Sequence, residues 1–258
     1  MLEIKNVSAG YGRHEVIKDV SLTLANGSLT VIIGPNGSGK STLLKTVTGT
    51  TDLTKGKILI DGCMLPKSTE RATRVSYLPQ GSTTPEMTVH ELVLHGRFPH
   101  LTFPRRFREA DRVAAETAMK RMSLEEYDDS LMSTLSGGMR QRAFIAMTLA
   151  TETDHLLLDE PCTYLDAAGK MSLMELLREL AAEGRVVAAV IHEIDLAMRY
   201  ADFICVMDGG SACFIGTPDE LYASGIVEKV FGIALDRVKG GCGWCYYYDS
   251  MKGSDTCG

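Results

Sequence analysis

The sequence predicts an α/β protein built on a parallel sheet, with a helical insertion between the two halves of that sheet. Two features predict the sheet: continuous apolar runs of strand length, and helical segments that separate them. Residues 155–161 (HLLLDEP) and 185–193 (RVVAAVIHE) are such runs. The insertion is predicted because residues 88–150 have helical patterning and little strand character.

The other elements follow in chain order. Three segments in the first sixty residues, LEI, VIKDVSLTL and KILIDG, have the two-residue period of strands and are bounded by Gly and Asn turn signals. Between the last two we expect a strand at 29–33, a glycine-rich loop, and a helix that ends near Gly49. After these we expect a short strand at 75–80 and an exposed loop at 96–108. One helix should begin near Glu109, and others should lie at about 140–148, 166–182 and 194–200. The last expected element is a hairpin at 203–216 that turns at Gly209 and Gly210.

Composition excludes several classes of protein. The 258 residues are 45% hydrophobic and 23% charged, which is ordinary for a globular chain with a full core. A net charge of −6 argues against a nucleic-acid binder that depends on bulk electrostatics. The longest apolar run, VVAAVI at 186–191, is shorter than the roughly 18 residues of a spanning helix. We expect no signal peptide and, with seven scattered cysteines, a reducing cytoplasm.

Residues 34–42 (GPNGSGKST), the phosphate loop, predict a nucleoside-triphosphate site. Gly34, Gly39, Lys40 and Ser41 satisfy the pattern G-x-x-x-x-G-K-[ST], and a strand and a helix flank it as required. The glycines let the backbone wrap phosphates, Lys40 brings a positive charge to the outer phosphates, and the Ser41 hydroxyl can bind Mg²⁺.

Asp159 and Glu160 directly follow three leucines, at the end of a predicted strand. A carboxylate in this position suits the Mg²⁺ shell, which is the role we expect for Asp159. Glu160 is then the candidate that orients and deprotonates an attacking water. Taken alone, the Asp-Glu pair reads equally well as a solvated turn.

Gln80 and His192 also lie at the carboxyl ends of predicted strands, where open α/β sheets bind ligands. An isolated histidine is more often a structural residue, and an isolated glutamine is unremarkable. Their shared position is what makes them candidates for the same site.

Residues 133–143 (STLSGGMRQRA) contain a second helix start that can attract anions. Ser136, Gly137 and Gly138 precede a helical run, so backbone N–H groups should point outward there. One nucleotide does not need two such helix starts from the same chain.

With these motifs in order, the chain resembles the nucleotide-binding subunits of ATP-binding-cassette (ABC) transporters. The resemblance covers about residues 1–232 and rests on GPNGSGKST, Gln80, LSGGMRQR, LLLDEP, YLD and His192. It implies a RecA-like P-loop NTPase core with an N-terminal antiparallel β subdomain (core and β subdomain at 1–84 and 153–232), an inserted helical subdomain at 85–152, and a C-terminal extension of unclear role at 233–258.

The resemblance also implies ATP and Mg²⁺ as cofactors and assigns roles in the site. Tyr11 would stack on adenine, Gln80 would touch Mg²⁺ and the attacking water, and His192 would contact the γ-phosphate. Asp166 would lie at the interface of a homodimer. The implied ATP-binding residues are Tyr11, Gly34, Pro35, Asn36, Gly37, Ser38, Gly39, Lys40, Ser41 and Thr42. The implied metal site is Ser41, Gln80 and Asp159, and the implied catalytic residues are Glu160, His192 and Gln80. The signature segment, which would act on the partner's nucleotide, is Leu135, Ser136, Gly137, Gly138 and Met139.

Two stretches, TVHELVLHGRFPHL and DEPCTYLD, resemble the ATPases of importers for ferric siderophores, haem or cobalamin. The implied protein is a peripheral ATPase on the cytoplasmic face of the membrane. Its partners would be a second copy of itself, a polytopic permease and, indirectly, an extracytoplasmic binding protein, with no nucleic acid. Two alternatives remain: a soluble assembly factor of the same fold, for example for iron–sulfur clusters, and a small-molecule kinase that would leave the LSGG motif without a purpose.

Some residues depart from the family pattern or lie outside it. Cys162 stands where many relatives have threonine, and Glu193 follows His192 where aspartate is usual. The tail from residue 239 has a C-x-x-C (Cys242 and Cys245) with Cys257 nearby, and we expect a flexible extension rather than a redox or metal site. We expect the arginine cluster (Arg97, Arg105, Arg106 and Arg108) to be a solvated face rather than a surface for permease or lipid, and the methionines of the lobe (Met119, Met122, Met132, Met139 and Met147) to pack in its core.

Overall fold

The computed structural model describes residues 1–65, 69–81, 83–241 and 243–250. Within these residues the central sheet has six strands in the order β10-β9-β3-β8-β7-β6. Its strands are β3 (Ser28–Ile33), β6 (Val75–Leu78), β7 (His155–Asp159), β8 (Val186–Val190), β9 (Phe203–Asp208) and β10 (Ser211–Gly216). All neighbours pair in parallel except β9 and β10, which form the predicted hairpin. The predicted α/β fold with a parallel sheet is confirmed.

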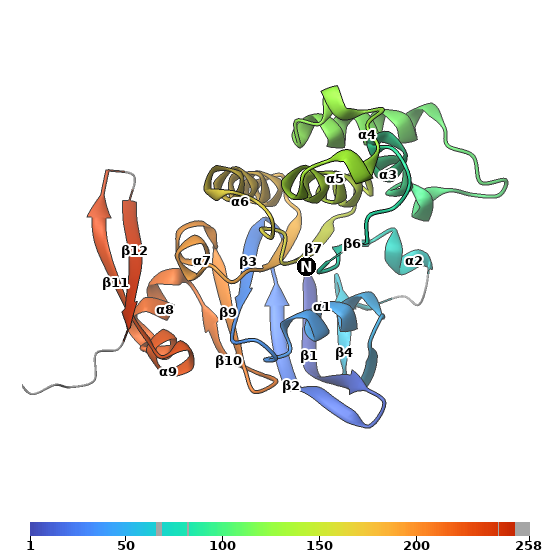
Figure 1. Cartoon of the computed structure of the whole chain (residues 1–258). Coiled ribbons are helices and arrows are strands. Elements are labelled where there is room, and N and C mark those ends of the chain that lie inside the picture. Colours follow the sequence, from blue (N-terminus) through green and yellow to red (C-terminus); the bar gives the residue numbers. More distant parts are fainter. Residues whose placement is uncertain (66–68, 82, 242, 251–258) are drawn as a thin grey trace, which may run out of the picture.

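A second, antiparallel sheet lies beside the first (Figure 1), in the order β2-β1-β4-β5. Its strands are β1 (Leu2–Tyr11), β2 (His14–Leu24), β4 (Asp52–Ile60) and β5 (Cys63–Met64). The helix α1 (Lys40–Thr48) lies between the two sheets, because its Leu43 and Leu44 share one buried cluster with Ile4 of β1 and Ile32 of β3. This arrangement confirms the antiparallel β subdomain.

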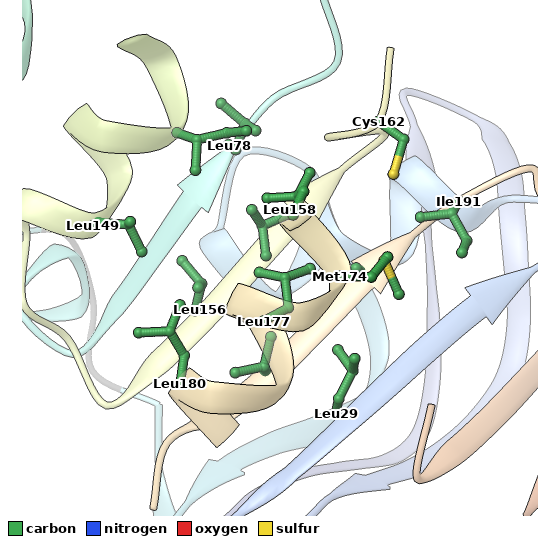
Figure 2. Packing of buried hydrophobic residues seen from close by; sticks show 14 of the residues in the cluster. Leu29, Leu78, Leu149, Leu156, Leu158, Cys162, Met174, Leu177, Leu180 and Ile191 are labelled. Carbon is green, nitrogen blue, oxygen red and sulfur yellow. The ribbon is translucent and has the colours of Figure 1, made fainter. Parts of the chain in front are cut away.

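Helices cover the opposite face of the central sheet. Leu156 and Leu158 of β7 belong to a large cluster on that face, whereas Leu157 belongs to the cluster that contains α1. Figure 2 shows Leu156 and Leu158 against Met174 and Leu177 of α6. The covering helices are α5 (Gly137–Ala150), α6 (Ala167–Ala182) and α7 (Ile194–Tyr200). Continuous apolar strands arise because both faces are buried.

The segment between β6 and β7 forms the helical lobe. It contains α3 (Val89–His95), η1 (Phe98–His100), α4 (Glu109–Arg121), η2 (Glu125–Tyr127), η3 (Met132–Thr134) and α5, and α2 (Thr69–Ala72) precedes β6. Thr88 begins α3 with a capping box, since its hydroxyl accepts from the Glu91 N–H and the Glu91 carboxylate accepts from the Thr88 N–H. The methionines of the lobe pack in or against its core, as predicted.

The expectation of an exposed arginine cluster is wrong for Arg97, whose side chain is buried. Its Nε donates to Asp111 at 3.1 Å, and one terminal nitrogen donates to the Ala150 carbonyl and to Glu152, both at 2.8 Å. Burial of a guanidinium is tolerated because its donors are paired in this way. The other three arginines of the cluster, Arg105, Arg106 and Arg108, are exposed as expected.

The C-terminal part contains α8 (Pro218–Ser224), α9 (Ile226–Phe231) and a hairpin of β11 (Ile233–Gly240) with β12 (Gly243–Ser250). The hairpin lies at the end of the molecule opposite the helical lobe (Figure 1). The prediction of a flexible tail from residue 239 is therefore wrong for residues 239–241 and 243–250, which belong to this hairpin. The hairpin is held by Arg237, whose guanidinium lies 4.3 Å from the Tyr222 ring centroid and 4.2 Å from that of Trp244, and pairs with Asp219.

Cys242 and Cys257 of the tail lie outside the described residues, and Cys245 is an exposed free thiol. In the part of the chain that is described, no group of three or more His, Cys, Asp or Glu side chains could hold a metal ion. That same part contains no helix with both the length and the apolar character needed to cross a membrane.

Candidate functional site

The phosphate loop runs from the end of β3 to the start of α1 and depends on glycine at two positions. Gly39 has φ 99°, and a Cβ there would lie 2.6 Å from the Ile17 Cγ2 atom. A Cβ on Gly34 would lie 2.2 Å from the Met207 carbonyl oxygen. Gly39 is also the N-cap of α1 and provides no side-chain cap, so the first N–H groups of the helix are available to an anion.

Lys40 places a buried cation at the centre of this loop. Its Nζ donates to the Gly34 carbonyl at 2.8 Å and to the Pro35 carbonyl at 2.9 Å, which braces the loop around the ammonium. Burial lowers the Lys40 pKa, and the nearby carboxylates of Glu160 and Asp159 oppose that effect. The position therefore carries a fixed positive charge with little water around it, which suits a phosphate group.

Asp159 ends β7 with a side chain that is almost fully buried. The Ser41 hydroxyl donates to its Oδ1 at 3.0 Å, and the Tyr77 hydroxyl donates to its Oδ2 at 3.2 Å. Burial raises the Asp159 pKa, while these two hydrogen bonds oppose the shift. Tyr77 was missed by the sequence analysis; its position on β6, next to β7, was the available signal.

The donors around Asp159 fit Mg²⁺. Magnesium takes oxygen ligands, and in nucleotide sites it is usually held by one or two carboxylates or hydroxyls together with phosphate oxygens. Here the Ser41 hydroxyl and the Asp159 carboxylate already converge. A soft or nitrogen-rich donor set, which would favour a transition metal, is not found among the described residues.

Glu160 and His192 meet across the ends of β7 and β8. His192 Nε2 lies 2.8 Å from Glu160 Oε1, so the imidazole and the carboxylate are in direct contact. Glu160 has φ 54°, an uncommon backbone conformation for a residue with a side chain. Its N–H donates to the Val190 carbonyl at 3.0 Å, which fixes this conformation at the strand end.

A cavity of about 610 Å³, the main cavity, brings together nine of the residues predicted for nucleotide binding and catalysis. The volume is in the range of small-molecule sites. Its lining residues are Val16, Asn36, Gly37, Gly39, Lys40, Ser41, Thr42, Gln80, Glu160 and His192. Asp159 lies beneath it and reaches it through Ser41. Val16, on β2, was not predicted as part of the site.

Tyr11 does not line the main cavity. Its ring is 51% exposed and its hydroxyl accepts from Thr51 Oγ1 at 3.3 Å, a hydrogen bond that lowers the Tyr11 pKa. An exposed ring can stack on a base. Stacking on adenine stays a prediction.

The signature segment begins α5 and does not line the main cavity either. Ser136 is the N-cap, and its hydroxyl accepts from the Met139 N–H at 3.3 Å. A Cβ on Gly138 would lie 3.1 Å from the Tyr164 carbonyl oxygen, so this turn of α5 packs tightly against residue 164. Gln141 was not predicted from the sequence. Its Nε2 donates to the Pro161 carbonyl at 3.1 Å and so links α5 to the turn after Glu160.

Asp166 is exposed and caps α6, since its Oδ1 accepts from the Gly169 N–H at 2.8 Å. This capping role is visible within one chain. A place in a dimer interface is compatible with its exposure and stays a prediction.

Known proteins are similar to this chain in both sequence and fold. Residues 17–163 match the ABC transporter family. The chain is 39% identical over 236 residues to the probable siderophore transport system ATP-binding protein YusV of Bacillus subtilis (strain 168), which covers 90% of this chain and 86% of that protein. It is 40% identical over 233 residues to the ferric enterobactin transport ATP-binding protein FepC of Escherichia coli (strain K12), which covers 89% and 86%. An ATP-binding cassette solved as a dimer in a post-hydrolysis state, bound to ADP and Pi, has a TM-score of 0.75 and 27% identity over 84% of this chain and 99% of that chain.

Proposed function

This chain belongs to the ABC transporter family, and from that premise we propose that it powers an importer for a metal chelate such as a ferric siderophore, haem or cobalamin. As an ATP-binding subunit of that family it hydrolyses ATP and couples the reaction to transport. Its relatives named above serve siderophore and ferric enterobactin transport. The observation that carries the catalytic part is the main cavity, where the phosphate loop meets Gln80, Glu160 and His192.

We infer the following roles for the residues in hydrolysis. The phosphate loop and Lys40 bind the β- and γ-phosphates, and Glu160 accepts the proton of the attacking water, a role worth roughly 10²–10⁴-fold in rate. His192 contacts Glu160 at 2.8 Å, which supports a role in orienting that carboxylate. We infer that it also contacts the γ-phosphate. Ser41, Asp159 and Gln80 would hold Mg²⁺, which neutralises charge on the phosphates.

We also propose that two copies form the working enzyme. The signature segment is an anion-binding helix start that lies outside its own chain's main cavity, which leaves it free to act on the partner's nucleotide. The dimeric cassette described above supports a paired arrangement. In this pair, Asp166 lies at the interface and Tyr11 stacks on the adenine base.

A permease supplies the membrane part of the transporter in this proposal. The chain is then a peripheral protein at the cytoplasmic face, and Gln80 connects the nucleotide to the permease. A binding protein outside the membrane delivers the chelate to the permease. We also retain the division into a core and β subdomain at 1–84 and 153–232 and a helical subdomain at 85–152.

The importer assignment is tested by purifying the tagged chain from detergent-solubilised membranes in its native host. The expected result is a polytopic permease in the purified complex, and uptake of a ⁵⁵Fe-labelled siderophore that is lost in the Glu160→Gln strain. A complex with only non-membrane partners would instead support the assembly-factor alternative. Phosphate transferred to an acceptor other than water would support the kinase alternative.

A further inference from the structure

We propose that the ion pair between Lys170 and Glu193 positions His192 for ATP hydrolysis. This inference rests on the proposed roles of Glu160 and His192. Lys170 lies in the first turn of α6, and Glu193 directly follows His192 at the start of α7. The Lys170 Nζ donates to Glu193 Oε1, and both side chains are 29% exposed, so the pair is partly shielded from water.

His192 lies between two anchored residues. On one side, the Ile191 N–H donates to the Ile32 carbonyl at 3.3 Å and its side chain is buried. On the other side, Glu193 is held by Lys170. The imidazole itself is 46% exposed, so packing constrains it little. In this proposal its direction toward Glu160 depends on the two anchors, a backbone hydrogen bond at Ile191 and a side-chain ion pair at Glu193.

The Glu193 carboxylate is directed to Lys170 and not to the helix that it precedes. Glu193 occupies the N-cap position of α7 but its side chain makes no cap hydrogen bond there. Burial alone would raise the Glu193 pKa, but the hydrogen bond and charge of Lys170, together with hydrogen bonds from the backbone of Glu193 and His192, lower it overall. The hydrogen bond with Glu193 raises the Lys170 pKa. Both groups are therefore charged at neutral pH.

Of the two residues that depart from the family pattern, Glu193 belongs to this pair and Cys162 lies beside it. A cavity of about 90 Å³ is lined by Lys170, Glu193 and Cys162 as well as by Glu160 and His192. Burial raises the pKa of Cys162 to about 12, so its thiol is neutral and does not compete with Glu193 for the ammonium. Glutamate has one more methylene than the usual aspartate, which extends its reach from the start of α7 toward α6.

A purely structural tether between α6 and α7 would have a different signature. It would stabilise the fold without affecting how His192 acts. The two roles are separated by comparing kcat with KM and with the melting temperature, and by asking whether the effect of Lys170 requires His192.

The experiment measures phosphate release by the purified chain. Lys170→Met keeps most of the side-chain length and removes the charge. We expect kcat to fall roughly 10-fold, because misplacing a catalytic group by about 1 Å costs up to 10²-fold. The KM for ATP and the melting temperature should be unchanged. Arg121→Met is the matched control, since it removes another partly exposed ion pair, Arg121 with Glu183 at 2.6 Å, outside the site. The control should keep the native kcat.

Two further variants decide the mechanism. In a His192→Ala background, Lys170→Met should produce no additional loss of kcat, and the charge-swapped pair Lys170→Glu with Glu193→Lys should recover most of the native kcat. An equal loss of kcat with and without His192 would overturn the inference, as would a native kcat for Lys170→Met. If His192→Ala alone has the native kcat, the catalytic assignment proposed above is itself wrong, and this inference is rejected with it.

Discussion

Two helix starts in this chain can face an anion, and they differ in construction. At α1, Gly39 has φ 99° and provides no side-chain cap, and a buried Lys40 lies beside the free N–H groups. At α5, Ser136 has φ −63° and caps the helix with its own hydroxyl. The nearby Arg140 donates back to the Leu135 carbonyl at 2.6 Å. The first start is a complete phosphate cradle within one chain, whereas the second offers fewer free donors.

Glycine occurs at the two helix starts for different structural reasons. In the phosphate loop, the backbone conformation itself requires glycine at Gly39. In the signature segment, Gly137 and Gly138 are ordinary helical residues, and a Cβ on either would make a tight contact with the neighbouring Tyr164, at 3.3 Å and 3.1 Å. Tyr164 is 72% exposed and itself has φ 66°. Glycine at the first start is therefore required by the backbone conformation of the loop, and at the second start it relieves a contact with a neighbouring segment.

The largest predicted effect is the loss of hydrolysis at the phosphate-loop site while ATP remains bound. Glu160→Gln removes the group that accepts the proton of water and keeps the size of the side chain. We expect hydrolysis to fall by roughly 10²–10⁴-fold, while ATP still binds and holds a dimer. Phosphate release and nucleotide binding by fluorescence are the measurements. Glu179→Gln, on the exposed face of α6, is the control and should be unchanged; a native rate for Glu160→Gln would remove Glu160 from the mechanism.

The second prediction concerns a substitution at the start of α5. Ser136→Arg places a bulky cation where the partner's γ-phosphate is expected, so hydrolysis should be lost by at least about 10²-fold, a loss comparable to removing a transition-state donor. ATP binding by the isolated monomer should be retained, because the main cavity contains no residue of the signature segment. Loss of nucleotide binding by that monomer would contradict the separation of the two sites.

A mixing experiment sharpens this prediction. Equal amounts of Ser136→Arg and Glu160→Gln chains, each inactive alone, should form mixed dimers in which one site has both its native Glu160 and a native signature segment. Roughly a quarter of the native activity should return if dimers form at random and the two sites of a symmetric pair are independent. No recovery from a demonstrably mixed dimer would mean that each chain uses its own signature segment.

Local signals made much of this structure predictable from sequence. The helix at 166–182, the helix at 194–200 and the turn at Gly209 and Gly210 are each specified within a few residues, and each was found close to where it was expected. Candidate site residues were predictable for a related reason. Gln80, Asp159 and His192 follow apolar strands, and parallel strands bring their carboxyl ends to one edge of the sheet.

Contacts between distant segments were not predictable in this way. Arg97 looks like part of an exposed basic loop, but it is buried by Asp111 and Glu152, which are 14 and 55 residues away. The Tyr77 hydroxyl reaches Asp159 across 82 residues. The C-terminal hairpin depends on Arg237 packing between Tyr222 and Trp244, a contact that no periodicity reveals.

The third prediction compares the same substitution at both helix starts. Gly39→Ala forces a side chain into a left-handed conformation 2.6 Å from Ile17, and should lower the free energy of unfolding by roughly 1–3 kcal/mol. Gly138→Ala gains about 1 kcal/mol of helix propensity, which offsets its 3.1 Å contact with the Tyr164 carbonyl, so its net effect should be near zero. Urea unfolding measures both. A larger loss for Gly138→Ala would reverse the comparison.

The smallest predicted effect is on stability against urea, and it comes from the buried charge of Asp159. It should distinguish the two helix starts, because only the first should respond to pH. Burial raises the Asp159 pKa above the unfolded value of about 3.9. Between that value and the folded pKa, the folded chain keeps a proton that the unfolded chain has released, so this group's contribution to stability falls as the pH rises, and it stays reduced at neutral pH.

Asp159→Asn removes this penalty and keeps the hydrogen bonds, because the hydroxyls of Ser41 and Tyr77 can each donate or accept. In the absence of Mg²⁺ and nucleotide, its urea midpoint should exceed that of the native chain at about pH 7, and the difference should shrink as the pH approaches about 4. Hydrolysis should be lost, since the carboxylate that would hold Mg²⁺ is gone. Ser136→Ala, which removes a neutral cap, should shift the midpoint by the same amount at every pH. A pH-independent difference for Asp159→Asn would mean that its carboxylate has no raised pKa, and the contrast between a charged, buried first site and a neutral second one would fail there.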